Sequence, residues 1–144
     1  MRALLDVNVL IALFDQQHVF HTLARDWLTG NADDGWASCP ITQAGFVRII
    51  SGPRYPGGVV STRALTMLGR ATADPHHAFW PDDVPLAGPG IDGVRVLGPG
   101  QVTDAYLLAL AVAHEGRFVT FDRRIDVNAV PRATTASLLV LPQA

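Results

Sequence analysis

Apolar residues are grouped along the chain in short runs, and most of these runs precede a stretch with helical spacing. The short runs, which have the length of strands, cover residues 3–5, 36–39, 77–80, 118–121 and 138–141. The stretches in which apolar residues recur three and four positions apart cover residues 7–14, 18–28, 40–50, 61–73 and 103–114. Because strands that alternate with helices build parallel sheets, the pattern predicts an α/β fold with a parallel sheet of about five strands.

Residues with special backbone preferences support two of the helix starts. Pro40 stands at the first position of the helix over 40–50, where the backbone N–H that proline lacks would have no partner within the helix. Ser61 or Thr62 is expected to cap the helix over 61–73.

A long segment without such spacing separates the third strand from the last helix. Glycine and proline recur throughout residues 82–100, so we predict a loop there, with a short extended piece at 94–96. The loop leads directly into the helix over 103–114, which makes it a candidate segment for contacting a substrate.

Length and composition indicate one packed domain. The chain has 144 residues, of which 49% are hydrophobic and 17% charged. A chain of this size buries a sufficient core, and no repeat or linker divides it. We therefore predict a single domain over residues 1–144.

The charge balance excludes some mechanisms. The formal net charge is −2, so a nucleic-acid substrate would have to be bound by a local cluster of cations, not by the surface as a whole. All 11 basic residues are arginines. A Schiff-base lysine and a P-loop lysine are therefore both excluded.

The sequence also indicates a cytoplasmic protein that does not enter a membrane. Its single cysteine, Cys39, cannot form an internal disulfide, which favours a reducing compartment. No apolar run approaches the roughly 18 residues of a spanning helix. Asp6 interrupts the apolar segment that a signal peptide would need.

Three aspartates occupy positions at which an α/β fold carries its chemistry. Asp6 ends the first strand, Asp122 ends the strand over 118–121, and Asp104 opens the helix over 103–114. Because ligands of open parallel sheets bind at the carboxyl ends of the strands, we expect these carboxylates to meet at one edge. Taken singly, each could be an ordinary turn former or a first-turn helix residue.

Clustered carboxylates point to a hard cation. Three negative charges repel one another unless a positive group lies among them. Sites made of oxygen donors suit Mg2+ or Mn2+, and the histidines of the chain lack the partner ligands that zinc requires. Such an ion can activate a water molecule and neutralise charge on a phosphodiester.

Four segments, read in order, resemble the motifs of PIN-domain nucleases, and specifically of the VapC toxins of toxin–antitoxin modules. They are residues 5–11 (LDVNVLI), 42–49 (TQAGFVRI), 103–111 (TDAYLLALA) and 119–123 (VTFDR). The resemblance covers nearly the whole chain. It implies a PIN-like three-layer sandwich and an Mg2+-dependent ribonuclease that inhibits growth, forms a homodimer and is neutralised by a VapB-type antitoxin.

One position departs from the family pattern. Many members carry a glutamate where this chain has Gln43, which could coordinate a cation through its carbonyl or position a water molecule but adds no charge. The predicted catalytic and metal-binding residues are then Asp6, Asp104 and Asp122, which suffice for one divalent ion.

Other polar residues near the motifs are candidates for supporting roles. Asn8 could bond to a carboxylate or cap a helix, and Thr120 could orient Asp122. Arginines that could contact RNA phosphates, or could simply be solvated, are Arg48, Arg123 and Arg124.

Two other function classes are alternatives to a nuclease. A non-catalytic PIN-like scaffold, which would bind RNA or a partner without cutting, is favoured by the neutral Gln43 and opposed by the three aspartates. An aspartyl-phosphate phosphatase requires a second aspartate where Asn8 stands, and a lysine in its site.

Overall fold

The computed structural model describes residues 1–96 and 98–142. The predicted domain of residues 1–144 therefore includes three positions, 97, 143 and 144, that lie outside the described residues. The elements follow in the order β1 (Ala3–Leu5), α1 (Val7–Phe14), α2 (His21–Gly30), β2 (Trp36–Ser38), α3 (Pro40–Ile50), α4 (Ser61–Thr72), β3 (His77–Phe79), α5 (Val102–Ala113), β4 (Arg117–Thr120) and β5 (Leu138–Val140). Short 3-10 turns connect some of them.

The five strands form one parallel sheet in the order β3-β2-β1-β4-β5. The first strand is central, with Leu4 opposite Ala37 of β2 on one side and Phe118 of β4 on the other. Because all the strands are parallel, their carboxyl ends lie at the same edge of the sheet. The prediction of a parallel sheet of about five strands is confirmed.

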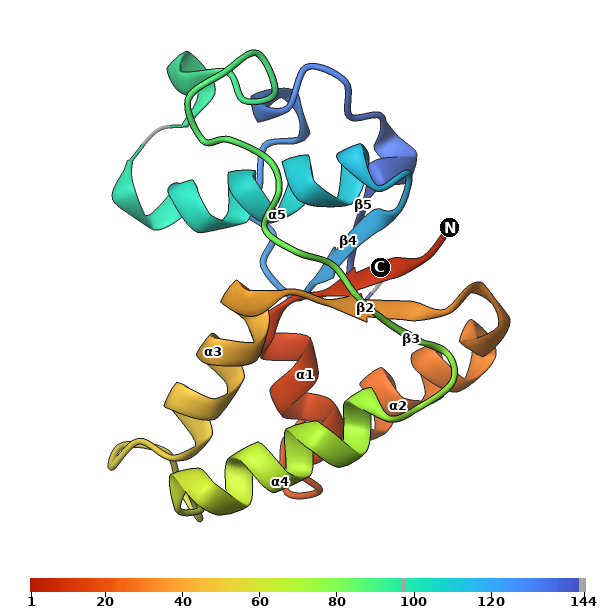
Figure 1. Cartoon of the computed structure of the whole chain (residues 1–144), viewed down its shortest axis with the longest axis vertical. Coiled ribbons are helices and arrows are strands. Elements are labelled where there is room, and N and C mark those ends of the chain that lie inside the picture. Colours follow the sequence, from red (N-terminus) through yellow and green to blue (C-terminus); the bar gives the residue numbers. More distant parts are fainter. Residues whose placement is uncertain (97, 143–144) are drawn as a thin grey trace.

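Helices cover both faces of this sheet, as Figure 1 shows, with α1 to α4 below it and α5 above. Neighbouring residues of β1 serve the two layers, because successive side chains of a strand point to opposite faces. Leu5 packs with Val9 and Phe46 in the core between the sheet and helices α1 and α3, whereas Leu4 packs with Leu107 of α5 on the other face. The three-layer sandwich is therefore present, and the central strand β1 is buried on both faces.

Helices α1 and α3 pack closely against each other near the start of α1. A Cβ added to Gly45 of α3 would lie 2.6 Å from Cγ2 of Val7, which is closer than side chains approach one another. Glycine at this position lets α3 pack against the first turn of α1.

Element boundaries differ from the sequence predictions in three places. The second helix starts at His21, not at residue 18, because the amide of His18 donates to the carbonyl of Asp15 in a preceding turn. The predicted cap at Ser61 or Thr62 is wrong, since Val60 holds the capping position without a side-chain hydrogen bond. The predicted extended piece at 94–96 is also wrong.

Residues Gly93–Arg95 instead form a 3-10 turn, η2. The carboxylate of Asp92 accepts the amide hydrogen of Val94 and stabilises this turn, a local interaction that hydrophobic patterning does not reveal. Within the described ranges, no helix is long and apolar enough to cross a membrane.

Candidate active site

The three predicted aspartates converge at the carboxyl edge of the two central strands. Asp6 directly follows β1, Asp122 lies two residues beyond β4, and Asp104 lies in the first turn of α5. The two strands are adjacent, with Leu5 opposite Val119, and the amide of Asp6 donates to the carbonyl of Val119. Parallel pairing therefore brings together residues that are more than a hundred positions apart in the sequence.

Asp6 is buried and held by two hydrogen bonds. Its side chain is the N-cap of α1, where Oδ1 accepts the amide hydrogen of Val7 at 2.8 Å. Its Oδ2 accepts the hydroxyl hydrogen of Thr120 at 2.6 Å. Burial raises the pKa of Asp6 more than these two bonds lower it, and the charge of Asp122 raises it further.

Thr120 links two of the aspartates. Its hydroxyl donates to Asp6, and its oxygen accepts the amide hydrogen of Asp122 at 3.0 Å. Asn8 supports this arrangement through longer bonds, since it donates to Thr120 and accepts from the amide of Phe121, both at 3.4 Å. Asn8 thus bonds to the neighbours of the carboxylates and not to the carboxylates themselves.

The pKa of Asp104 is affected by the charges of both other acids. Burial, followed by the charges of Asp6 and Asp122, raises the pKa of Asp104 to about 6, and Arg124 opposes this shift. Burial of a carboxyl group close to other acids is an arrangement that often marks functional sites. Asp104 also lines a small hollow of about 30 Å³ with Arg95 and Arg124.

Asp122 differs from the other two because it has a cationic partner. Arg124 holds it by a forked ion pair, and this hydrogen bonding lowers the pKa of Asp122. The two other predicted phosphate contacts are less involved with the acids. Arg123 is exposed beside Asp122, and Arg48 lies in the second half of α3, where it lines a surface hollow with Arg54.

Gln43 is anchored to a different polar cluster. Its amide Nε2 donates to Oγ of Ser38 at 3.0 Å, and the same oxygen lies 2.8 Å from Nε2 of His77. Burial is the main reason that the pKa of His77 is lowered, which favours a neutral ring. In the described contacts, Gln43 therefore belongs to the end of β2 and not to the acidic centre.

Sequence reasoning missed Ser38, His77 and Arg95. The first two meet across adjacent strands, and no local pattern shows such a pairing. The position of Arg95 was signalled indirectly, because the loop that leads into α5 was expected to contact a substrate.

The donor atoms at the acidic edge suit a hard divalent cation. Carboxylate oxygens predominate there, and the charges of Asp6 and Asp122 act with burial to raise the pKa of Asp104, so a cation would relieve the repulsion among these acids. The side chains are not arranged as a finished metal site, because within residues 1–96 and 98–142 no three His, Cys, Asp or Glu side chains are grouped so that they could hold a metal ion. Two of the carboxylates are instead occupied by Thr120, Val7 and Arg124.

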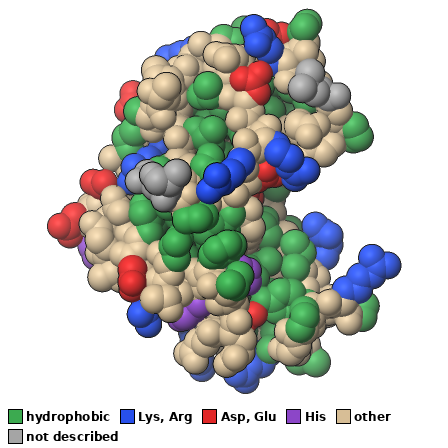
Figure 2. All heavy atoms as spheres, turned by 180° about the vertical axis from the view of Figure 1, so that it is seen from behind, with side chains coloured by type: hydrophobic (Ala, Val, Ile, Leu, Met, Phe, Trp, Pro, Cys, Tyr) green, Lys and Arg blue, Asp and Glu red, His purple; other side chains and the backbone are tan. Residues whose placement is uncertain are grey.

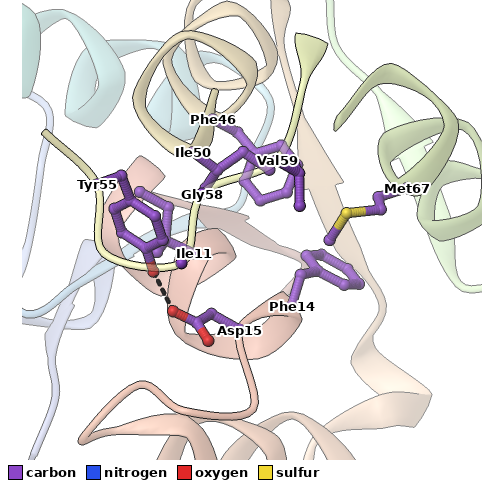
Figure 3. A pocket seen from close by; sticks show the side chains of 10 residues that line it. Ile11, Phe14, Asp15, Phe46, Ile50, Tyr55, Gly58, Val59 and Met67 are labelled. Atoms are coloured by element: carbon purple, nitrogen blue, oxygen red, sulfur yellow. Dashed lines mark hydrogen bonds between the residues drawn. The ribbon is translucent and has the colours of Figure 1, made fainter. Parts of the chain in front are cut away.

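A separate apolar pocket with a volume of about 80 Å³ lies at the C-terminal end of α1, whereas Asp6 lies at the N-terminal end of this helix. In Figure 3, Phe14, Phe46, Ile50 and Met67 surround it, and the hydroxyl of Tyr55 donates to Asp15 at its border. Burial, together with this bond to Asp15, raises the pKa of Tyr55 to about 12. The pocket lacks the clustered acids of the sheet edge, so we place the candidate chemistry at the edge.

The chain is similar to known proteins over most of its length. The PIN domain model matches residues 3–131. Over 142 residues the chain is 58% identical to Ribonuclease VapC44 of Mycobacterium tuberculosis, which covers 98% of this chain and 100% of that protein. Ribonuclease VapC39 of the same organism is 49% identical over 132 residues, covering 90% and 94%.

A crystal structure of VapBC2 from Rickettsia felis, bound to a DNA fragment from their promoter, has the same fold. Its chain superposes with a TM-score of 0.63 over 96% of this chain and 97% of its own, at 13% sequence identity. The matched domain and the full-length similarity lead to one conclusion: the chain belongs to the PIN-domain family and, within that family, to the VapC proteins.

Proposed function

We propose that this protein is a metal-dependent ribonuclease that hydrolyses RNA phosphodiester bonds in the cytoplasm and acts as the growth-inhibiting toxin of a toxin–antitoxin module. The observation that carries the proposal is the convergence of Asp6, Asp104 and Asp122 at one sheet edge, in a chain 58% identical to a named ribonuclease over nearly its whole length. Mg2+ is the proposed cofactor, with Mn2+ as a substitute.

The roles of the protein's own residues follow from their surroundings. Asp6, Asp104 and Asp122 would hold the cation, and Thr120 keeps the carboxylate of Asp6 in place by its hydrogen bond. When bound, the ion would supply an activated water molecule and neutralise charge that develops on the phosphodiester. The pKa of about 6 at Asp104 means that this carboxyl can retain a proton until a cation or a higher pH removes it.

Arginines near the acids provide the local positive charge that an RNA substrate needs. In Figure 2, arginine side chains lie on both sides of an indentation between the part of the molecule formed with α5 and the part formed by α1 to α4. Arg95 and Arg124 line the hollow beside Asp104, and Arg123 is exposed next to Asp122. Arginine binds phosphate through paired N–H groups, so these side chains would position the RNA backbone.

The test is direct. Purified protein is incubated with total RNA, with and without Mg2+, and the new RNA ends are mapped. We expect discrete cleavage that requires the ion and is lost in Asp104→Asn. RNA binding without any cleavage would instead support a non-catalytic scaffold, the alternative that the neutral Gln43 favours.

We further propose a VapB-type antitoxin as the protein partner and a homodimer as the state of the toxin. The related VapBC2 protein of Rickettsia felis was crystallised as a complex with promoter DNA, and this chain shares its fold. Exposed apolar side chains such as Val60 and Leu65, at the start and middle of α4, are available for such contacts. Co-expression with a small neighbouring reading frame should relieve toxicity, and light scattering at micromolar concentration should give the mass of a dimer.

A further inference from the structure

Arg124 occupies both oxygens of Asp122. Its Nε donates to Oδ1 at 3.0 Å and its Nη2 donates to Oδ2 at 2.9 Å. The backbone amide of Arg124 also donates to Oδ1, at 2.9 Å. A cation that uses this carboxylate must therefore compete with a forked guanidinium.

The pair is placed where it can open. The side chain of Arg124 is 80% exposed, and that of Asp122 is 20% exposed. Within the described part of the chain, the guanidinium makes its hydrogen bonds with Asp122 alone. Ion pairs with one exposed partner contribute little to folding stability, so releasing the arginine costs the fold little.

A small hollow lies next to the guanidinium of Arg124. Arg124 lines the hollow of about 30 Å³ that Asp104 and Arg95 also line. Arg95 is loosely held, with Nη1 at 3.9 Å from Oδ2 of Asp126 and a side chain that is 55% exposed. Two weakly committed guanidinium groups beside an acid form a suitable binding place for a phosphate group.

We propose that Arg124 is a displaceable counterion of Asp122: a divalent cation releases it, and the freed guanidinium then binds a phosphate of the RNA beside Asp104. This inference rests on the proposed function, because it takes the cation and the RNA as ligands of the same edge. Binding of either ligand then favours binding of the other, since both require the open ion pair. Arg124 is a positioning residue in this scheme.

The first experiment measures cation binding without RNA. Mn2+ is titrated into the wild-type protein, Arg124→Gln and Arg123→Gln, and free Mn2+ is followed by electron paramagnetic resonance. The two variants remove the same charge from neighbouring exposed positions, but only residue 124 pairs with Asp122. We expect Arg124→Gln to bind Mn2+ roughly two- to fivefold more tightly than Arg123→Gln, the factor that an exposed ion pair is worth.

The second experiment measures coupling. The affinity for a mixed-sequence 2′-O-methyl oligoribonucleotide is determined with and without Mn2+, and the length of the oligonucleotide is checked after each titration so that cleavage is excluded. The gain on adding Mn2+ should be smaller in Arg124→Gln than in the wild type. Arg123→Gln removes a proposed phosphate contact and so lowers the affinity for RNA with and without Mn2+, but its gain on adding Mn2+ should equal that of the wild type, because Arg123 does not pair with Asp122.

The outcomes separate this inference from the proposed function. If the wild type binds Mn2+ and the two variants bind it equally, Arg124 is not a counterion that the cation displaces, although the metal site stands. If Arg124→Gln binds Mn2+ more tightly but keeps the full coupling, the phosphate role is overturned. If the wild type binds no Mn2+, the metal-dependent function and this inference both fail.

Discussion

Two polar clusters lie at the carboxyl edge of the same sheet, and they differ in how well their groups are satisfied. At β2, the buried Ser38 bonds to the half-buried Gln43 and His77 in an uncharged network. After β1 and at the start of α5, the pKa values of Asp6 and Asp104 are raised by burial and by neighbouring negative charge. A neutral network of hydrogen bonds stabilises the fold, whereas unrelieved like charge is tolerated where a ligand is to bind.

The largest expected effect distinguishes the two clusters by activity. Asp104→Asn and Asp6→Asn should reduce RNA cleavage at least ~100-fold, the order of magnitude that follows loss of a group stabilising charge in the transition state. The same variants should melt at an equal or higher temperature, because removing a charge from the cluster relieves repulsion. Cleavage assays and thermal melts on the same preparations measure both.

Asp33→Asn is the matched control, since Asp33 is exposed in a turn remote from the sheet edge. It should change neither property. Unfolding of the Asp6 or Asp104 variants, or retention of cleavage, would mean that the acids have a structural role.

The neutral cluster should show the opposite behaviour. Ser38→Ala removes the oxygen that bonds to Gln43 and His77 and leaves both side chains with an unpaired polar atom. We expect a loss of roughly 1–3 kcal/mol in the free energy of unfolding, with cleavage retained at a temperature where the variant is folded. Urea unfolding measures the loss, and Ser61→Ala, at an exposed helix start without a side-chain cap, is the control.

A smaller effect concerns the pH dependence of cation binding. The pKa of Asp104 is raised to about 6, so its proton must leave before the carboxylate binds a cation. The rise in melting temperature on adding Mg2+ should therefore be small at pH 5 and should increase as the pH passes through about 6. A rise that is independent of pH, or one that persists in Asp104→Asn, would exclude Asp104 as a ligand.

The same shift has a consequence for the metal-free protein. A carboxyl whose pKa is higher in the folded state contributes stability at acidic pH, and this contribution is lost as the pH rises through the folded pKa. Because of Asp104, the free energy of unfolding of the metal-free protein should fall as the pH rises from about 4 to about 6. Asp104→Asn should reduce this fall.

The smallest expected effect is at Gln43. Because its amide is bonded to Ser38, Gln43→Glu should leave the Mg2+-induced rise in melting temperature unchanged. The variant should also be slightly less stable, since a carboxylate cannot donate to Ser38 as the amide does. A larger Mg2+ effect than in the parent would instead place residue 43 at the acidic centre, the role that the resemblance suggested.

The sequence predicted most of the fold because the inner strands of the sheet are buried on both faces. Strands such as Ala3–Leu5 and Arg117–Thr120 are short apolar runs for that reason, and the helices between them show clear periodicity. Errors arose where local polar contacts decide the backbone. In the 3-10 turn at Gly93–Arg95 the carboxylate of Asp92 accepts the amide hydrogen of Val94, and before α2 the carbonyl of Asp15 accepts the amide hydrogen of His18.

The acidic site was predictable for a related reason. Asp6 directly follows β1, Asp122 lies two residues beyond β4, and Asp104 lies at the start of an apolar helix, so the topology brings the three acids to the same edge of the sheet. The partners of these acids were less accessible to sequence reasoning. Side-chain packing decides that Gln43 bonds to Ser38 and that Arg124 is the arginine that pairs with Asp122. No sequence pattern shows these contacts.

The most direct test of the central claim is a crystal structure of the protein with Mn2+, in which anomalous scattering locates the ion. Our account predicts one anomalous peak bound by oxygens of Asp6, Asp104 and Asp122, with the guanidinium of Arg124 turned away from Asp122. A peak elsewhere, or none at a concentration that supports RNA cleavage, would contradict it.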